Sequence, residues 1–346
     1  MLSTLRSILG LATKDEFNQY YGCVFDSSSV SVVFFSAGAP VNWFSERLAQ
    51  GIVANGRIID QDQFSQVLRI CINKCGRTVK NIVFGVDGAN CYCSFISVRQ
   101  KRNPEKQVTH KDLMTVYAEA ARNSIDSAVE QVYAATGNPD IELECAFTET
   151  TMIKLDEIVC PSPEGKLGAV LEISTFSTFC EPAYLEALAD AANNAGLVFK
   201  TVVPVDFAVA KHLDKKMTDA HNSVIISIRR DYTNLSVVFG GSLIQRKTLP
   251  LGSGAFEREL EFWVQSLELL FKEFLGIKTF SPNVYICGSD LERTDFWEML
   301  EWYEWEKQIP FKSKPVFTKL DAAFFDFPLE LKGNLLVAGV LGICKE

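Results

Sequence analysis

The sequence SVIISIRRDYTNLSVVFGGSLIQRKTLPLGSG, at residues 223–254, gives the clearest indication of the fold. Apolar residues alternate in it with small or polar ones over three runs: Val224–Ile228, Leu235–Phe239 and Leu243–Leu249. A period of two is typical of strands with one buried face. Gly240 and Gly241 separate the second and third runs, and two glycines suit a tight hairpin turn that needs positive φ. The segment therefore predicts three successive antiparallel strands.

A polar turn, Arg229–Asn234, joins the first two of these strands, and the glycine-rich loop Gly252–Gly254 follows the third. Backbone N–H groups converge in such a turn and can bind a phosphate. The amphipathic helix predicted after Gly254 also favours an anion at its N-terminus. The unit is typical of a nucleotide site or of its remnant, but a plain hairpin with a solvated turn explains the pattern equally well.

A similar strand–turn–strand unit occurs near the start of the chain, where residues 22–35 read GCVFDSSSVSVVFF. Its turn is Asp26–Ser29, and Val30, Val32 and Phe34 alternate after it. A repeated hairpin with a polar turn predicts two halves built on one plan. The chain has 346 residues, a length at which a single core is about saturated, so two domains or one bilobed body is expected.

Composition excludes several classes of function. The 43 carboxylates outnumber the 34 lysines and arginines, and this net charge of -9 disfavours nucleic acid as a general partner. No apolar run reaches the roughly 20 residues of a membrane span. The 10 cysteines mostly lie inside strand or helix patterns and the 3 histidines form no ligand pair, so we expect buried reduced thiols and no metal site.

Taken together, the motifs resemble the bacterial actin-like proteins of the FtsA and PilM type. The resemblance covers most of the chain from Gly22 onward. Besides the two turns, it is carried by NGRIIDQDQF at 55–64, VTHKDL at 108–113, PSPEGKLGAVLEIS at 161–174, AGLVFKTVVPVDFAVA at 195–210 and VYICGS at 284–289. It implies a bilobed actin-like α/β fold, a duplicated ribonuclease-H-like fold with a small inserted α+β domain. The implied domains are a first lobe at 1–85 and 177–220, an inserted domain at 86–176 and a second lobe at 221–346.

The resemblance also implies a nucleotide cleft whose loops are altered. The candidate nucleotide-binding residues are Asp26, Ser28, Ser29, Ser227, Arg229, Arg230, Gly252, Gly254, Gly288 and Ser289. Ser28 stands where the family has a glycine that lets the backbone approach phosphate. Ser227 replaces the acid near Mg²⁺, and Arg229 and Arg230 replace two glycines. We expect a degenerate cleft without efficient ATP hydrolysis, for which ATP with Mg²⁺ and no cofactor at all both remain open, and we assign no catalytic residue.

The function implied by the resemblance is a cytoplasmic scaffold at the inner face of the inner membrane. A PilM-like component of the type IV pilus platform would bind a PilN-like cytoplasmic tail, and an FtsA-like division protein would bind the FtsZ C-terminal tail. The alternative is a working ATP-binding, polymerising FtsA-like protein that tethers FtsZ, and self-association into a ring or filament is expected. A sugar-kinase-like enzyme would need a catalytic aspartate facing a sugar pocket, which no motif marks.

Some features of the sequence favour the pilus role and others favour the division role. FtsA-like proteins usually end in a linker and an amphipathic membrane helix, which are not found before Glu346, whereas the motifs at 108–113 and 161–168 are nearer FtsA. The candidate membrane residues Leu2, Leu5, Ile8 and Leu9 share one helical face, which also suits a helix packed on its own domain or a disordered start.

Three further local predictions concern helices. Asp60 and Thr109 are predicted N-caps, because Gln63 and Asp112 follow them three positions later. Residues 290–307 predict one acidic, aromatic helix, for which a docking face and ordinary packing are both open. Asn334 is the predicted cap of a final helix at 335–343.

Overall fold

The computed structural model describes residues 18–76, 79–138, 140–217 and 221–345. These residues form two compact units, of which one is Cys91–Pro182 and the other joins residues 18–90 with those from Ala183 onward. The first of these units begins and ends a few residues later than the insertion expected at 86–176. The candidate membrane residues Leu2, Leu5, Ile8 and Leu9 lie outside the described residues.

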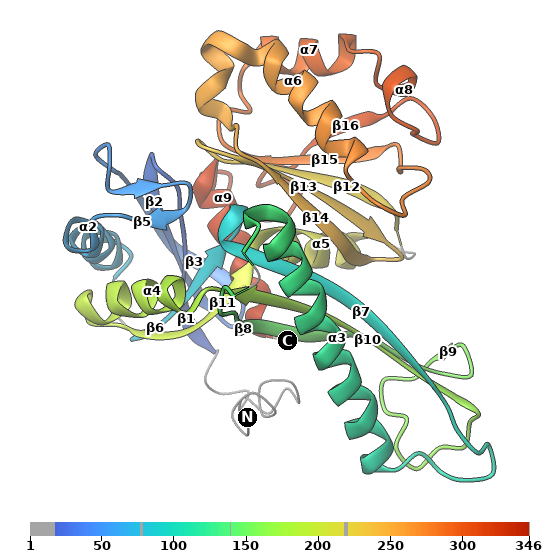
Figure 1. Cartoon of the computed structure of the whole chain (residues 1–346). Coiled ribbons are helices and arrows are strands. Elements are labelled where there is room, and N and C mark those ends of the chain that lie inside the picture. Colours follow the sequence, from blue (N-terminus) through green and yellow to red (C-terminus); the bar gives the residue numbers. More distant parts are fainter. Residues whose placement is uncertain (1–17, 77–78, 139, 218–220, 346) are drawn as a thin grey trace. The chain divides into compact units, whose positions relative to one another are not determined.

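The first half of the larger unit is built on a five-stranded sheet in the order β11-β6-β1-β2-β3 (Figure 1). Its strands are β1 (Gln19–Phe25), β2 (Ser29–Ser36), β3 (Ala39–Arg47), β6 (Asn81–Val86) and β11 (Val198–Pro204). The first three strands are antiparallel, whereas β6 pairs in parallel with β1 and β11 pairs in parallel with β6. A small hairpin of β4 (Val53–Ala54) and β5 (Arg57–Ile58) follows β3.

The second half repeats this arrangement in the order β14-β13-β12-β15-β16. Its strands are β12 (Ser223–Ile228), β13 (Thr233–Phe239), β14 (Ser242–Leu249), β15 (Asn283–Gly288) and β16 (Val316–Lys319). Three antiparallel strands again precede two parallel ones, and Gly240 and Gly241 form the hairpin turn with positive φ. The two sheets match in order and direction strand for strand, so the prediction of two halves built on one plan is confirmed.

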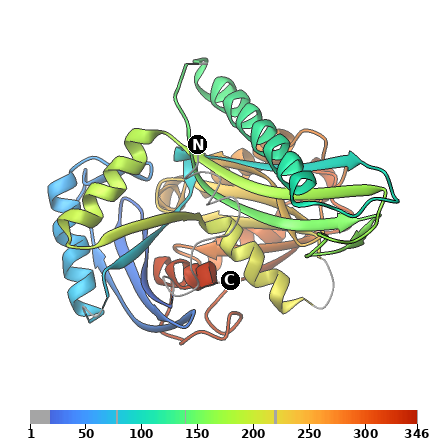
Figure 2. The same cartoon turned by 90° about the horizontal axis from the view of Figure 1, so that it is seen from below.

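The two halves exchange helices, so that a helix of each half packs on the sheet of the other. Helix α5 (Val205–Lys216) follows the last strand of the first sheet but packs on β12, β13 and β14 of the second. Helix α9 (Asn334–Gly339) follows the second sheet but packs on β1, β2 and β3 of the first, as Figure 2 shows for the red helix beside the blue strands. Each half therefore completes the core of the other.

The remaining helices of the larger unit lie on the outer faces of the sheets. They are α2 (Gln61–Lys74), α4 (Pro182–Asn194), α6 (Phe256–Lys272), α7 (Thr294–Trp302) and α8 (Trp305–Gln308). The side chain of Asp60 accepts a hydrogen bond from the backbone N–H of Gln63, which confirms the predicted N-cap of α2. Helix α6 buries its predicted apolar stripe, in which Trp263 and Leu267 are fully buried.

Two local predictions for the C-terminal part are wrong. Residues 290–307 form two short helices, because Trp305 turns inward and donates its indole N–H to the carbonyl of Leu300 at 2.9 Å. Most aromatic side chains of this segment pack in or against the hydrophobic core, although Trp302 is 88% exposed. Asn334 is not a cap: Gly333 holds the N-cap position of α9, and the helix continues from Gly339 into a 3-10 turn.

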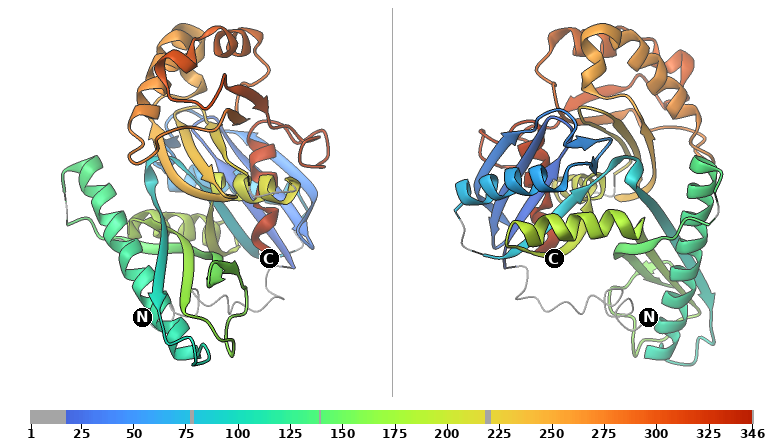
Figure 3. Two further views of the ribbon diagram at one scale, coloured as in Figure 1. Left: turned by 90° about the vertical axis from the view of Figure 1, so that its right-hand side faces the viewer. Right: turned by 60° about the vertical axis from the view of Figure 1, so that its left-hand side comes forward.

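The smaller unit is a four-stranded antiparallel sheet covered on one face by a long helix (Figure 3). Its elements are β7 (Cys91–Lys101), α3 (His110–Thr136), β8 (Glu144–Leu155), β9 (Ile158–Val159) and β10 (Val170–Cys180). Val116 and Ala120 of α3 pack on Leu171 and Ile173 of β10 in its core. Among the described helices of both units, none is long and apolar enough to cross a membrane.

The capping box at the start of α3 provides a test of local stability. The Thr109 hydroxyl accepts from the Asp112 N–H at 3.2 Å, and the Asp112 carboxylate accepts from the Thr109 N–H at 2.9 Å. We expect Thr109→Ala to destabilise the first turns by about 1 kcal/mol and to speed their hydrogen exchange about five-fold. Exchange measured by mass spectrometry on α3 peptides checks this, with Thr115→Ala as a matched control inside the helix. Equal exchange in both variants would contradict it.

Candidate functional site

Two polar turns from the two sheets face each other in the larger unit. In the first, between β1 and β2, the carboxylate of Asp26 is fully buried. Its Oδ1 accepts hydrogen bonds from the backbone N–H groups of Ser28 at 2.8 Å and Ser29 at 3.1 Å, and from the Ser28 hydroxyl at 2.6 Å. The amides that a turn of this kind can offer to an anion are therefore taken by a carboxylate of the turn itself.

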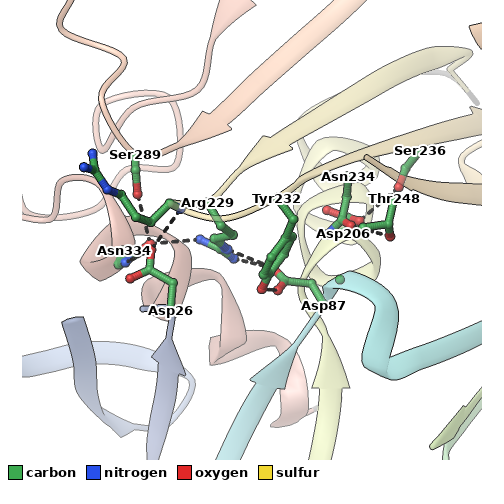
Figure 4. Close-up of polar contacts among 12 residues, drawn as sticks. Asp26, Asp87, Asp206, Arg229, Tyr232, Asn234, Ser236, Thr248, Ser289 and Asn334 are labelled. Carbon is green, nitrogen blue, oxygen red and sulfur yellow. Dashed lines mark hydrogen bonds and ion pairs between the residues drawn. The ribbon is translucent and has the colours of Figure 1, made fainter. Parts of the chain in front are cut away.

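The same carboxylate also reaches the second turn, between β12 and β13. Its Oδ2 accepts from the backbone N–H of Arg230 at 3.3 Å and from the side-chain amide of Asn334 at 2.8 Å. Beside it, the Ser27 hydroxyl donates to the carboxylate of Asp231. Asp26 thus occupies the point between the turns at which their donors converge (Figure 4).

A buried ion pair lies next to these contacts. Arg229 is fully buried, and its Nε and Nη2 donate to Oδ2 of Asp87 at 2.9 and 2.7 Å. Its Nη1 donates to Oδ1 of Asn334 at 3.2 Å, and the Tyr232 hydroxyl donates to the other oxygen of Asp87. Asp87 follows β6 in the first half, so this group joins the two halves through side chains (Figure 4).

The pair sets the protonation states of its members. Burial alone lowers the pKa of the Arg229 guanidinium, but the adjacent Asp87 carboxylate outweighs this effect and raises the pKa above its ordinary value. Burial, and then the charge of Asp87, raise the pKa of the Tyr232 phenol well above its ordinary value. Arg229 is therefore a fixed cation and Tyr232 a fixed hydrogen-bond donor.

The glycines predicted to approach a phosphate are required by contacts within the chain. A Cβ on Gly252 would collide with the carbonyl oxygen of Arg229, and one on Gly288, where φ is +125°, would collide with the carbonyl oxygen of Ile228. The Gly254 N–H donates to the Arg230 carbonyl at 2.9 Å. Because backbone already packs against them, these glycines do not indicate a ligand.

A small open cavity of about 340 Å³ adjoins the two turns. Four of the ten candidate nucleotide-binding residues line it: Ser28, Ser29, Arg230 and Ser289. The other six, including Asp26, Ser227 and Arg229, do not line it, and these three side chains are fully buried. Arg230 is partly exposed and lies 3.8 Å from the carboxylate of Asp290. The structure thus brings the predicted residues together, but the assignment of nucleotide binding to them stays a prediction.

Three residues central to the site were missed by sequence reasoning. Asp87 carries no prediction, Tyr232 lies inside the polar turn Arg229–Asn234 but is not among the candidate residues, and Asn334 is predicted only as a helix cap. Only Asp87 had a local signal, since an Asp-Gly pair after a buried strand is a position at which ligands often bind. The role of the other two depends on contacts between distant segments.

A third buried carboxylate lies between the halves. Asp206 of α5 is fully buried, and its Oδ2 accepts from the Ser236 hydroxyl of β13 at 3.0 Å. Its Oδ1 has no hydrogen-bond partner among the described residues. Burial raises its pKa to about 7, Arg246 opposes this shift, and the charge of Asp87 adds to it. Figure 4 shows it beside Asn234 and Thr248, which are joined by a hydrogen bond of 2.8 Å.

These contacts limit the chemistry of the site. The carboxylates of Asp26 and Asp87 are both engaged in internal hydrogen bonds or an ion pair. Among the described residues, no group of three or more His, Cys, Asp or Glu side chains is arranged to hold a metal ion. The residues present therefore do not fit Mg²⁺–ATP, because the amides of Ser28, Ser29 and Arg230 and the carboxylates of Asp26 and Asp87 already have partners within the chain.

Comparison of the structure with solved structures gives its fold. A structure described as the PilM–PilN type IV pilus biogenesis complex matches with a TM-score of 0.62, over 94% of this chain and 98% of that chain, at 13% identity. The chain has the actin-like fold. The resemblance predicted from the motifs is thus confirmed at the level of the fold, with the duplicated sheets and the inserted unit as expected.

Other matches are weaker. The ethanolamine utilization protein EutJ from Carboxydothermus hydrogenoformans matches with a TM-score of 0.47 at 13% identity, over 94% of this chain and 88% of that chain. The cytoplasmic domain of EpsL from Vibrio cholerae matches with a TM-score of 0.40 at 8% identity, over 95% of each chain. No family model matches the sequence, and no curated protein sequence matches it either.

We expect removal of one member of the buried ion pair to lower the free energy of unfolding, on average, by more than half of what removal of both members does. Arg229→Met leaves the Asp87 carboxylate buried without its cation, so we expect a loss of about 3–5 kcal/mol in the free energy of unfolding. Arg229→Met combined with Asp87→Asn removes both charges, and we expect it to lose less than the sum of the two single variants. Urea denaturation of all four proteins measures this, and strict additivity would contradict it.

Asp206 predicts a pH dependence of stability. Because its pKa is about 7 in the folded protein, the folded state holds a proton there that the unfolded chain has already lost, and stability falls as pH rises towards 7. We expect the wild type to lose about 2 kcal/mol relative to Asp206→Asn between about pH 5.5 and about pH 8. Urea denaturation of both proteins across this range measures the difference. Parallel stability curves would show that Asp206 is charged throughout.

Proposed function

We propose that this protein is an actin-fold scaffold at the cytoplasmic face of the inner membrane, which docks the cytoplasmic tail of a membrane protein and works without nucleotide. The observation that carries this proposal is the position of the Asp26 carboxylate. It accepts from amides of both turns and from Asn334, so an internal anion stands where a phosphate would bind.

Three charged residues line the cavity: Arg230, Asp290 and Lys332. ATP carries its own negative charge and is normally bound with Mg²⁺, which itself needs carboxylate or water ligands. Of the two cations, Arg230 is already close to Asp290. Asp87 is neutralised by Arg229 and cannot act as a free metal ligand or general base.

The proposed partner follows from the fold. The matched structure is described as a complex of PilM with PilN, and a PilN-like membrane-protein tail is the partner that we propose by analogy. A role in a type IV pilus or secretion platform is favoured over the FtsA-like division role on this basis. Binding of the FtsZ tail and self-association into a ring or filament remain hypotheses supported only by the resemblance of the motifs.

A phosphoryl-transfer enzyme is a poorer explanation of the site. Asp87 occupies the end of a parallel strand, where a catalytic carboxylate would be plausible on geometric grounds. Its oxygens, however, accept from two nitrogens of Arg229 and from the Tyr232 hydroxyl. A general base must be able to reach a proton of the substrate, and this carboxylate is 5% exposed.

Calorimetric titration with ATP and Mg²⁺ tests the proposal. We expect no saturable heat with the wild type at millimolar nucleotide, because the donors of both turns are occupied. The variant compared with the wild type combines Asp26→Ala with Arg230→Gly. The first substitution releases the backbone donors of the turns, and the second removes a side chain that lines the cavity. An Arg229→Gly variant is unsuitable, because it would leave Asp87 buried without its cation.

The result separates the two main hypotheses. Absence of binding in the wild type, whether or not the variant gains it, supports a scaffold that works without nucleotide. Saturable binding of one ATP by the wild type would overturn the proposal and favour an ATP-dependent assembly switch of the FtsA type. Denaturation midpoints of both proteins verify that each is folded.

A further inference from the structure

A pocket lies inside the smaller unit, between helix α3 and the sheet. Its volume is about 50 Å³, and α3, β8 and β10 all line it. Ala121 and Ser124 of α3 are small, and the strand residues Thr148 and Ser177 opposite them are also small, so no large side chain fills the space at this level. Ile125, which is 48% exposed, forms part of its rim.

Buried hydroxyl groups without partners mark the floor of this pocket. Ser124 is fully buried and Thr175 is 5% exposed, and neither hydroxyl has a hydrogen-bond partner among the described residues. The hydroxyl of Ser94, which pairs in register with Ser177 on the neighbouring strand, is also buried without a partner. Each such group costs about 1–3 kcal/mol when it stays unsatisfied, so the two whose residues line the pocket, Ser124 and Thr175, indicate a site built for a partner.

The segments that form the pocket carry mainly negative charge, although α3 also holds Lys111 and the exposed Arg122, and β8 holds Lys154 near its end. From residue 123 to residue 153 the chain has no Lys, Arg or His. The carboxylates of this stretch are Asp126, Glu130, Asp140, Glu142, Glu144 and Glu149. All but Glu149 are exposed, and Asp126 and Glu144 directly neighbour the pocket residues Ile125 and Cys145. The field around the pocket therefore favours a cationic partner and disfavours an anionic one, including an acidic membrane surface.

We infer that this pocket docks a Lys- or Arg-containing peptide segment and takes one short side chain of that segment between α3 and the sheet. About 50 Å³ holds only a few water-sized groups, which matches a side chain such as valine or threonine rather than an aromatic one. The apolar walls from Tyr117, Ile125 and Phe179 contact its methyl groups. The hydroxyls of Ser124 and Thr175 bind its polar atom or the peptide backbone.

This inference rests on the proposed function for one point, the origin of the segment. Cytoplasmic flanks of membrane proteins are rich in Lys and Arg, so the tail of a membrane protein has the required charge. The pocket and its charge are independent of the nucleotide cleft. Failure of the proposed function in the calorimetric test would therefore leave this docking site standing, and the reverse also holds.

Selection of peptides from a displayed random library of twelve residues tests the inference. The full chain is the target, and soluble Ala121→Leu protein is the competitor, because leucine at this rim position fills the pocket from the solvent side. We expect enriched peptides to contain several Lys or Arg residues and one short aliphatic residue or threonine. Their affinity, measured by fluorescence anisotropy, should fall at least ten-fold with Ala121→Leu.

Two further variants separate the contributions of charge and hydrogen bonding. Glu142→Lys combined with Glu144→Lys changes only exposed residues, and we expect several-fold weaker binding and a smaller dependence on salt. Ser124→Ala removes an unpartnered buried hydroxyl, so it should weaken peptide binding while leaving the denaturation midpoint unchanged or higher. This readout distinguishes a binding role from a structural one.

Several outcomes would overturn the inference. They are the absence of any peptide that prefers the wild type over Ala121→Leu, the enrichment of acidic peptides, and affinities unchanged by both the pocket and the charge variants. Self-association of the wild type that Ala121→Leu abolishes would assign the pocket to a second copy of the chain, and would equally overturn it. Matching denaturation midpoints are required before any loss of binding is counted.

Discussion

The buried guanidinium of Arg229 constrains the larger unit more than any other group described here. A cation removed from water is stable only with close counter-charge and full hydrogen bonding. Its hydrogen-bond partners come from two separate places: Asp87 after β6, which also accepts from the Tyr232 hydroxyl, and Asn334 at the start of α9. The two halves must therefore meet in one register, because displacement of either would leave a charge buried alone.

The same constraint involves the two facing turns. In a cleft that binds phosphate, the donors of two facing turns must remain free until the ligand enters. Here Asn334 bridges Arg229 and Asp26, and Asp26 takes amides from both turns. The arginine and the aspartate are thus parts of one internal network that closes the space between the turns. A scaffold gains a rigid junction from this arrangement, whereas a nucleotide switch would lose the opening that it needs.

Both units contain buried polar groups without partners. Next to the two turns of the larger unit, the carboxylates of Asp26 and Asp87 are bonded within the chain, whereas the hydroxyls of Ser227 and Ser253 have no partner among the described residues. In the smaller unit, buried hydroxyls of Ser124 and Thr175 line a cavity and have no partner among the described residues. Unsatisfied buried donors are rare in folded proteins, because each one lowers stability. The unpartnered hydroxyls of Ser124 and Thr175 differ from those of the larger unit in that their residues line a cavity.

Local sequence determined the strands, their hairpins and two of the three predicted helix caps, since Asn334 is not a cap. Alternation in residues 223–254 needs only the period of a strand, two glycines suffice for the turn at 240–241, and the caps at Asp60 and Thr109 are formed by residues three positions apart. The repeat of one pattern in both halves was also sufficient to predict the duplicated fold. These features depend on interactions within a few residues, so the sequence alone contains them.

Only the tertiary structure decided what the site contains. Asn334 and Asp26 are 308 residues apart, and Arg229 and Asp87 are 142 apart, so no local pattern could pair them. An arginine in a polar turn is usually solvated, and its complete burial here follows from the exchange of α5 and α9 between the halves. The sequence therefore determined which turns face the cleft, whereas long-range packing decided that their polar groups would bind one another.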